Sequence, residues 1–209
     1  MNEIITLSKS FHEDIQSFGE LVLFEKDNIV YADTLNYVYF IISGKLKISE
    51  INFGTNKEQT LNILSKGDIH DIVTIMDSAP HEYSLTALEP SQAIKMPITI
   101  VRSWIDERKE FRDYFLRYVS NQIRSVEELA LGLSLHTSLT RLIKLILDSA
   151  DKNSRKYQWI KGLNHEEISA IIGSVRNVVN RDLQKLKKKG VIDIKRKAIE
   201  LKDITMLEE

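Results

Sequence analysis

The chain has 209 residues, enough for two modest domains, and its composition, with 43% hydrophobic and 28% charged residues and a formal net charge of −1, is that of an ordinary soluble globular protein. It contains no cysteine, which excludes disulfides, thiolate catalysis, and cysteine-ligated zinc or iron–sulfur clusters. No apolar run approaches the ~18 residues of a membrane span and the N-terminus lacks the pattern of a signal peptide, so a cytoplasmic location is expected.

The first hundred residues predict short strands separated by turns, as in a small β-sandwich or β-roll. The β-rich runs are 21–24, 29–31, 37–42, 45–51, 60–64, 83–87 and 93–96. Ser43-Gly44 predicts a hairpin turn, and Gly54 marks another.

A long helix is expected next, from Thr99 or Ser103 to about Leu135. Apolar residues recur along it at alternating steps of four and three, the seam of a two-stranded coiled coil. The seam residues, and so the expected dimer interface, are Phe115, Val119, Gln122, Val126, Leu129 and Leu133. Gln122, the one polar member, would pair with its symmetry mate. Two alternatives stay open: a seam rotated to include Ile123 and Ala130, or a helix that packs only on its own roll.

An amphipathic helix is expected over residues 138–147, followed by a surface loop over 148–157 and then by two short helices joined by a tight turn. Asn164 and Glu167 form a capping-box pattern at the start of the first short helix, whose apolar face is Ile168, Ile171 and Ile172. Gly173 stands where the chain must reverse, and Ser174 is expected to cap the second helix.

The second short helix is amphipathic, with Val175, Val179, Leu183 and Leu186 on its inner face. Its outer face carries Arg176, Asn177, Asn180, Arg181 and Gln184, which can hydrogen-bond base edges or phosphates. A merely solvated face is the alternative interpretation. A β-hairpin follows, with Ile192, Ile194, Ile199 and Leu201 inward and a basic tip at residues 195–197. Residues 155–209 carry 13 Lys/Arg against 8 Asp/Glu, which favours nucleic-acid binding at this end.

At these residues the sequence resembles the Crp/Fnr family of bacterial transcription regulators. The residues that match the family's helix-turn-helix pattern are Leu163, Glu167, Ile168, Gly173, Arg176, Val179, Arg181, Leu183, Leu186, Gly190 and Ile192. Arg141 matches an arginine of the preceding helix, and YFIISGKLKIS and residues 64–68 resemble segments of the family's β-roll. The resemblance implies an α+β chain with a cyclic-nucleotide-binding-like β-roll (1–98), a dimerisation helix (99–136) and a winged helix-turn-helix (137–209).

The resemblance also implies a homodimer that binds a palindromic promoter site and contacts RNA polymerase. The residues expected to contact DNA are Ser174, Arg176, Asn177, Asn180, Arg181, Lys195 and Lys197. Most relatives carry glutamate where this chain has Asn177. Because asparagine pairs with adenine N6/N7, we expect a half-site richer in A·T than TGTGA or TTGAT.

The cyclic-nucleotide site departs from the family pattern. In relatives that bind cyclic AMP, a glutamate contacts the ribose and an Arg-Ser pair contacts the phosphate. Aligned from Gly67-Asp68, the glutamate position holds Ile72 and the Arg-Ser pair becomes Glu82-Tyr83. Val126-Glu127 stand where those relatives use small hydroxyl residues. A carboxylate would repel the phosphate, so no cyclic-nucleotide binding is expected.

The signal, if any, stays open among three hypotheses: haem or another small ligand, as in nitric-oxide sensing; a protein partner; or no signal beyond protein abundance. His12, His70, His81 and His136 are candidate haem ligands without a metal-binding spacing. No motif of an enzyme occurs, so catalytic residues are not expected. The remaining alternative is a ligand-binding or scaffolding β-roll that does not bind DNA.

Overall fold

The computed structural model describes residues 9–30, 35–52, 54–55, 57–79, 83–154, 156, 159–195 and 198–203. By its contacts the chain divides into two units, each considered by itself. The first comprises Met1–Ile51 and Leu61–Val126, and the second comprises Asn52–Thr60 and Glu127–Glu209. The three-part division with boundaries after residues 98 and 136 stays a prediction.

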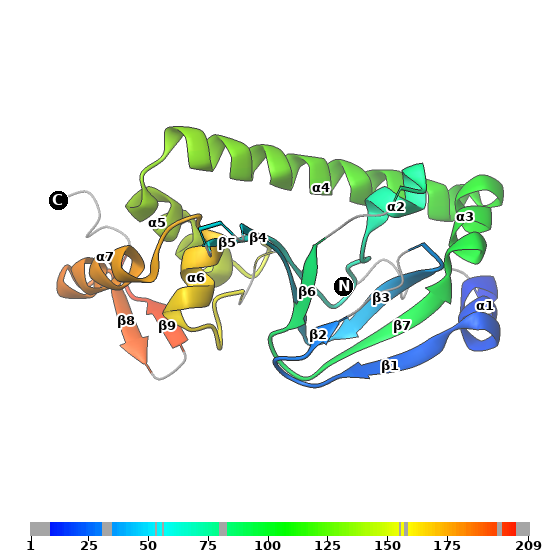
Figure 1. The fold of residues 1–209 in the computed structure, drawn as a ribbon, viewed down its shortest axis with the longest axis horizontal. Coiled ribbons are helices and arrows are strands. Elements are labelled where there is room, and N and C mark those ends of the chain that lie inside the picture. The colour runs from blue at the N-terminus through cyan, green and yellow to red at the C-terminus, as the bar shows by residue number, and fades with distance from the viewer. Residues whose placement is uncertain are drawn as a thin grey trace. The chain divides into compact units, whose positions relative to one another are not determined.

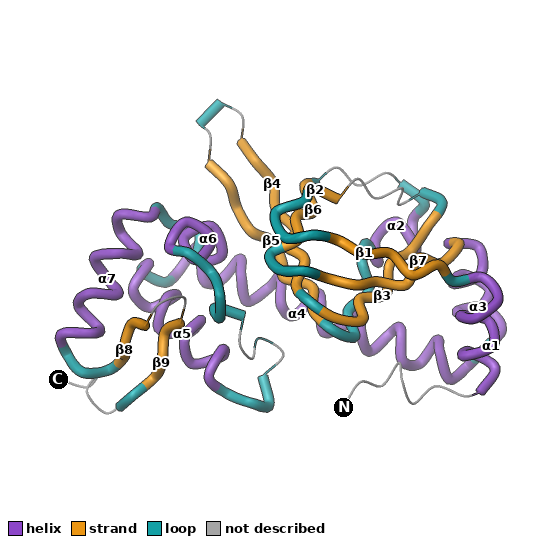
Figure 2. Tube along the Cα trace, turned by 90° about the horizontal axis from the view of Figure 1, so that it is seen from below, coloured by secondary structure: helices purple, strands orange, loops and turns teal. Residues whose placement is uncertain are grey.

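The first unit is built on two antiparallel sheets (Figure 1), and every strand expected from the sequence is present. One sheet has the order β1-β7-β3, the other β2-β6-β4-β5. The strands are β1 Glu20–Phe24, β2 Ile29–Val30, β3 Tyr37–Ser43, β4 Lys45–Asn52, β5 Lys57–Ser65, β6 Ser84–Ala87 and β7 Ser91–Pro97. The expected turn at Gly54 joins β4 to β5, which run side by side (Figure 2), and Asn52 Oδ1 accepts hydrogen bonds from the backbone N–H groups of Gly54 and Thr55. The α+β class and the roll are thereby confirmed.

The turn at Ser43-Gly44 is not the expected hairpin. Strand β3 bonds to β7 whereas β4 bonds to β6 and β5, so this turn carries the chain from one sheet to the other. Gly44 has a φ of 83°, and a Cβ there would lie 2.2 Å from Ser91 Oγ. A tight turn that requires glycine is shared by hairpins and by such corners, which explains the wrong prediction.

Alternation along the strands gives the β1-β7-β3 sheet two apolar faces, each with its own core. Between the sheets, Tyr39, Ile41 and Ala93 pack with Leu46, Leu64, Leu85 and Ala87. On the other face, Val38, Phe40 and Met96 pack with a cluster from the helices α2 (Ile72–Asp77), α3 (Ile98–Glu107) and α4 (Lys109–Leu135). Aromatic residues dominate that second cluster: Trp104, Phe111, Tyr114, Phe115 and Tyr118.

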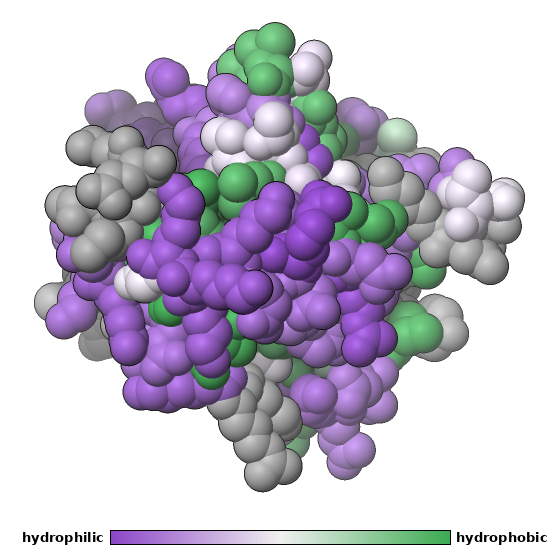
Figure 3. All heavy atoms as spheres, turned by 90° about the vertical axis from the view of Figure 1, so that its left-hand side faces the viewer, coloured by the Kyte–Doolittle hydropathy of each residue, from purple (hydrophilic) through white to green (hydrophobic). Residues whose placement is uncertain are grey.

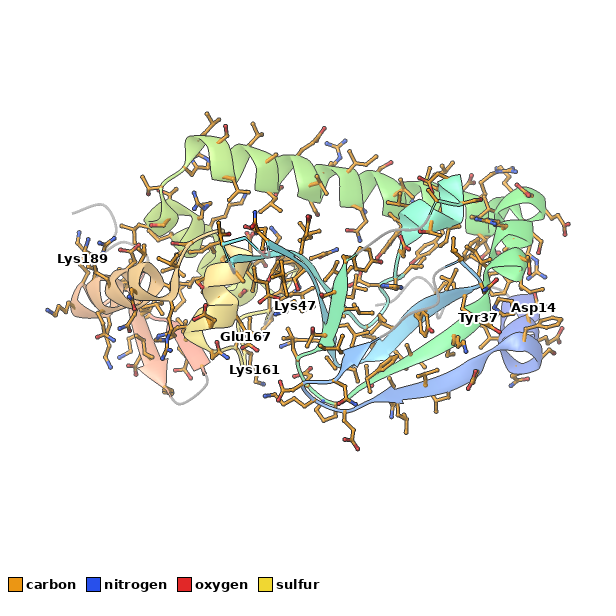
Figure 4. The ribbon with its side chains drawn as sticks, viewed as in Figure 1. Asp14, Tyr37, Lys47, Lys161, Glu167 and Lys189 are labelled. Atoms are coloured by element: carbon orange, nitrogen blue, oxygen red, sulfur yellow. The ribbon has the colours of Figure 1, made fainter. Side chains whose placement is uncertain are left out.

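The long helix expected from the sequence is broken in two at Arg108, whose backbone is extended. Asp14 lies on the unforeseen N-terminal helix α1 (Lys9–Phe18) (Figure 4). It accepts a hydrogen bond from Trp104 Nε1 at 2.8 Å and pairs with the Arg108 guanidinium. Periodicity alone could not reveal the break, because Trp104 and Phe111 face the same core from both sides of it.

The second unit contains the remaining elements, which gather as helices and a hairpin (Figure 1). They are α5 Ser138–Ala150, α6 His165–Ile171, α7 Arg176–Lys188, β8 Ile192–Lys195 and β9 Ala198–Leu201. Helix α5 extends beyond the expected end, so residues 148–150 belong to it rather than to a loop. The two short helices and the hairpin lie where the sequence placed them, which confirms a winged helix-turn-helix. Among the described residues, no helix is long and apolar enough to cross a membrane.

The aromatic cluster under α4 should dominate the stability of the first unit. Phe111 is fully buried, so the Phe111→Ala change should lower the free energy of unfolding by about 3–5 kcal/mol through lost burial and a cavity. Denaturant unfolding at fixed protein concentration measures this, with Leu23→Ala as the control because Leu23 is 67% exposed. Equal losses in the two variants would contradict this assignment of the core.

Candidate DNA-binding face

Helix α6 begins as the sequence predicts. The Asn164 side chain accepts a hydrogen bond from the Glu167 backbone N–H at 2.9 Å, and Glu167 Oε2 accepts one from the Asn164 backbone N–H at 2.6 Å. This capping box satisfies two N–H groups that the helix itself leaves unpaired. Ile168 and Ile172 are buried and Ile171 is partly buried, so the apolar face is also as expected. The first helix of the motif is therefore held rigidly at its start.

The turn after α6 is a Schellman motif. The Ser174 N–H bonds to Ser169 O at 2.8 Å and the Gly173 N–H bonds to Ala170 O, with Gly173 at a φ of 61°. Helix α7 then starts with Val175 as its N-cap residue and without a side-chain cap. The prediction that Ser174 caps this helix was wrong, because the Schellman turn uses Ser174 to close the previous helix.

Helix α7 separates its polar and apolar faces. Val179, Leu183 and Leu186 are at most 2% exposed. The residues of the expected outer face are all exposed: Arg176, Asn177, Asn180, Arg181 and Gln184. Val175, predicted to face inward, is 54% exposed because it lies in the cap rather than in the helix. The side of the molecule on which α7 lies is mostly hydrophilic (Figure 3). One helix thus presents two arginines and three amides together.

Asp182 has a role that the sequence analysis missed. It is 3% exposed and accepts a hydrogen bond from Ser138 Oγ at 3.1 Å, at the N-terminus of α5. Its other carboxylate oxygen lies 3.4 Å from Arg181 Nε. A carboxylate at a helix N-terminus is stabilised by the helix dipole. Asp182 lies three residues after the buried Val179, and residues at this spacing share a helix face. This spacing could have predicted that Asp182 points inward.

The hairpin β8-β9 carries the basic wing only in part within the described residues. Lys195 lies 2.7 Å from Glu200 Oε2, and the hydrogen bond and charge of Glu200 raise the pKa of Lys195. A phosphate must therefore compete with Glu200 for this ammonium group. Lys197 lies outside the described residues. The last turn of α7 adds Lys185, Lys187 and Lys188, with Lys189 just beyond its end (Figure 4).

The expected dimer seam on α4 needs correction at Phe115, and Gln122 has a partner within the chain. Phe115 is 2% exposed in the chain's own core and has no surface left for a second chain. Gln122 accepts a hydrogen bond from Asn62 Nδ2 on β5 at 3.0 Å, so its amide oxygen has a partner within the chain. Val126 and Leu133 are exposed, whereas Val119 and Leu129 are partly buried. The exposed apolar residues of α4 also include Leu116 and Ile123, next to an exposed Ala130.

In the segment that the sequence aligns with the family's cyclic-nucleotide site, polar side chains bond to one another within the chain. Ile72 begins α2, and the preceding Asp71 accepts hydrogen bonds from the backbone N–H and the hydroxyl of Thr74. Tyr83 Oη lies 2.8 Å from His70 Nε2, and burial, aided by the charge of Asp71, raises the pKa of the Tyr83 phenol far above its usual range. Glu82 lies outside the described residues.

The candidate metal-ligating histidines do not come together in the described part of the chain. His70 is 1% exposed and bonded to Tyr83, whereas His136 is exposed at the end of α4. The side chain of His12 and all of His81 lie outside the described residues. No group of three or more potential metal ligands occurs among the residues that were searched.

The capping box makes a testable contribution to this face. Asn164→Ala removes the acceptor for the Glu167 N–H, so it should lower the free energy of unfolding by about 1 kcal/mol. Asn164→Ser should retain most of that stability, because a hydroxyl can accept the same hydrogen bond. Thermal or denaturant unfolding compares the variants. A serine variant as unstable as the alanine variant would contradict the capping role.

Comparison with known proteins agrees with this geometry. Residues 140–209 match the Crp-like helix-turn-helix domain, and residues 21–108 match the cyclic nucleotide-binding domain. A CRP-like cAMP-activated global transcriptional regulator of Mycobacterium tuberculosis is 27% identical over 170 residues, or 79% of this chain and 75% of that protein. A global nitrogen regulator of Nostoc sp. is 25% identical over 184 residues, or 84% of this chain and 82% of that protein.

Solved structures share the fold. FixK2 from Bradyrhizobium japonicum superposes with a TM-score of 0.76 at 16% identity, over 91% of this chain and 96% of that one. A CooA variant from Carboxydothermus hydrogenoformans gives a TM-score of 0.75 at 20% identity, over 100% of this chain and 94% of that one. The family comprises regulators of transcription rather than enzymes. With a cyclic-nucleotide-binding-type roll, a long helix and a Crp-like helix-turn-helix, the chain belongs to the Crp/Fnr family of DNA-binding transcription regulators.

Proposed function

We propose that this regulator acts as a homodimer on a palindromic promoter site and binds it without cyclic AMP. The observation that carries the proposal is the outer face of α7, where arginines and amides are exposed over a buried apolar face. A recognition helix of this kind fits the major groove, and a two-fold dimer presents two of them about one helical turn (~34 Å) apart.

Base recognition follows from the chemistry of that face. Arg176 and Arg181 match the O6/N7 pair of guanine, and Asn177 matches the N6/N7 pair of adenine. We infer a half-site with adenine opposite Asn177, richer in A·T than TGTGA or TTGAT. Helix α7 starts without a side-chain cap, so its first backbone N–H groups can donate to a phosphate. Ser174, Asn180, Lys195 and Lys197 complete the proposed contacts.

Dimerisation is proposed along the exposed apolar stripe of α4. Leu116, Val119, Ile123, Val126, Ala130 and Leu133 alternate at steps of three and four. This is the rotated seam that the sequence left open, and it keeps Val119, Val126 and Leu133 from the first prediction. Leu116, Ile123 and Val126 are each more than half exposed, and a second copy of α4 would bury them.

Independence from cyclic AMP is supported by the groups that stand in the nucleotide region. By the alignment from Gly67-Asp68, Tyr83 stands at the second position of the family's Arg-Ser pair, and the buried Asp71 directly precedes Ile72 at the glutamate position. A buried phosphate monoanion requires a cation, and a carboxylate close to it would raise its energy. The cyclic AMP named for the M. tuberculosis relative is therefore not transferred to this chain.

RNA polymerase is the further partner proposed, since regulators of transcription act through it, and the cytoplasm is the proposed location, since the promoter lies there. Haem ligation by His70 would require its contact with Tyr83 to rearrange. Haem ligation by His136 would place the haem at the exposed end of α4. An absorption spectrum of the purified protein tests for haem directly.

Selection from random duplex DNA, without added ligand, should return a palindrome with adenine opposite Asn177. Arg176→Ala should weaken binding to that palindrome by about fivefold to 150-fold, because a bidentate base contact is lost. Fluorescence anisotropy measures the dissociation constant. Arg117→Ala is the matched control, because Arg117 is an exposed arginine of α4 far from α7 in the sequence. An unenriched pool from folded protein would contradict ligand-independent recognition.

A charge in the seam should separate the protomers. Ile123→Glu places a carboxylate against its symmetry mate in an apolar contact, so the variant should be monomeric at concentrations where the wild type is dimeric. Analytical ultracentrifugation measures the mass. Leu131→Glu is the control, since Leu131 is 56% exposed on α4 but lies outside the stripe. A dimeric Ile123→Glu protein would rule out this seam.

A further inference from the structure

Some backbone carbonyl groups in the turn between α6 and α7 can accept hydrogen bonds from outside the two helices. In the Schellman motif, Ser169 O and Ala170 O each accept a backbone hydrogen bond. Ile172 O and Gly173 O follow immediately, close to the start of α7 at Arg176. Side chains from two distant segments bind these carbonyls, so the position of the turn depends on residues outside the helix-turn-helix.

Arg141 of α5 binds the turn from one side. Its Nε donates to Ile172 O at 2.6 Å and its Nη2 donates to Gly173 O at 3.2 Å. The same guanidinium donates through Nη1 to His136 O at the end of α4. A cation at a helix C-terminus is favourable because the carbonyl end of the helix dipole is negative. Arg141 therefore joins the ends of α6 and α4.

Gln59 of β5 binds the turn from another segment. Its Nε2 donates to Ala170 O at 2.9 Å and to its neighbour's carbonyl, Thr60 O, at 3.0 Å. Residues 52–60 belong to the same contact unit as the helix-turn-helix, although the rest of β4 and β5 belongs to the roll unit. The tip of the β4-β5 hairpin is thus linked to the DNA-binding unit through a side-chain donor.

Gly173 is the point at which these contacts meet. A Cβ at Gly173 would lie 2.3 Å from Leu133 Cδ2 and 2.9 Å from Gln59 Oε1. Glycine is required here by close approach as well as by its positive φ. The fit leaves little room for the turn to shift toward α4 or toward the hairpin tip.

We propose that Gln59, together with Arg141, is a positioning residue for DNA recognition. The Gln59 amide fixes Ala170 O and thereby the turn from which α7 projects Arg176 and Asn177. This inference rests on the proposed recognition of DNA by α7. It adds that specific affinity is set in part by a side chain of the β4-β5 hairpin, which does not itself contact DNA.

The test compares two substitutions that separate hydrogen bonding from packing. Gln59→Glu keeps the size of the side chain but replaces the NH₂ donor with an oxygen that faces Ala170 O. Gln59→Ala removes the side chain altogether. Both should weaken binding to the selected palindrome by about threefold to tenfold, the effect expected for one lost hydrogen bond. Binding to random duplex and its salt dependence should stay unchanged, because the phosphate contacts remain.

A second readout does not depend on DNA. Hydrogen exchange of the Ser174 amide, which bonds to Ser169 O, should be faster in both Gln59 variants than in the wild type. Gln92→Ala and Gln92→Glu are the matched controls, since Gln92 is an exposed strand glutamine of the roll. These controls should bind and exchange as the wild type does.

The outcomes separate the two claims. A wild type that selects no palindrome would refute the proposed recognition of DNA. A wild type that binds its palindrome, with a Gln59→Glu variant that binds and exchanges identically, would overturn the positioning role alone. Tighter binding by the Gln59 variants would also overturn it, because the amide would then hold the turn away from its DNA-binding position.

Discussion

The separation of α7 into a buried and an exposed face is the constraint on which the function depends. Val179, Leu183 and Leu186 are removed from water, and their burial fixes the rotation of the helix about its axis. Asp182 adds a directional contact to the N-terminus of α5 through Ser138. With the rotation fixed, Arg176, Asn177 and Arg181 face solvent as one group. An amphipathic helix that packed against no other element would not hold these side chains in one direction.

The long helix α4 shows how one element serves two surfaces. Phe111, Tyr114 and Phe115 face the roll, whereas the stripe that includes Ile123 and Val126 faces outward. Around the helix axis, these two directions differ by about the angle between successive residues, roughly 100°. A steady alternation of apolar residues is thus compatible with either seam, and only packing against the roll selects between them.

The strands, the capping box of Asn164 and the amphipathic α7 could be predicted, because each depends on residues close together in the sequence. Three of the differences from the structure share one cause. Ser43-Gly44, Phe115 and Gln122 were assigned from local pattern, but their roles are decided by Ser91, the roll core and Asn62, which lie far away in the sequence. Gln59 and Arg141 could not be assigned for the same reason: their partners are backbone carbonyls, which leave no mark on composition or periodicity.

The central claim is that α7 recognises DNA without cyclic AMP. The most direct test is to titrate a duplex that contains the selected palindrome with the purified protein. The titration is repeated over a range of salt concentrations, with and without added cyclic AMP. The account predicts saturable binding whose logarithmic dissociation constant rises linearly with the logarithm of salt concentration and is unchanged by the nucleotide. Binding that appears or tightens severalfold only when cyclic AMP is present would contradict it.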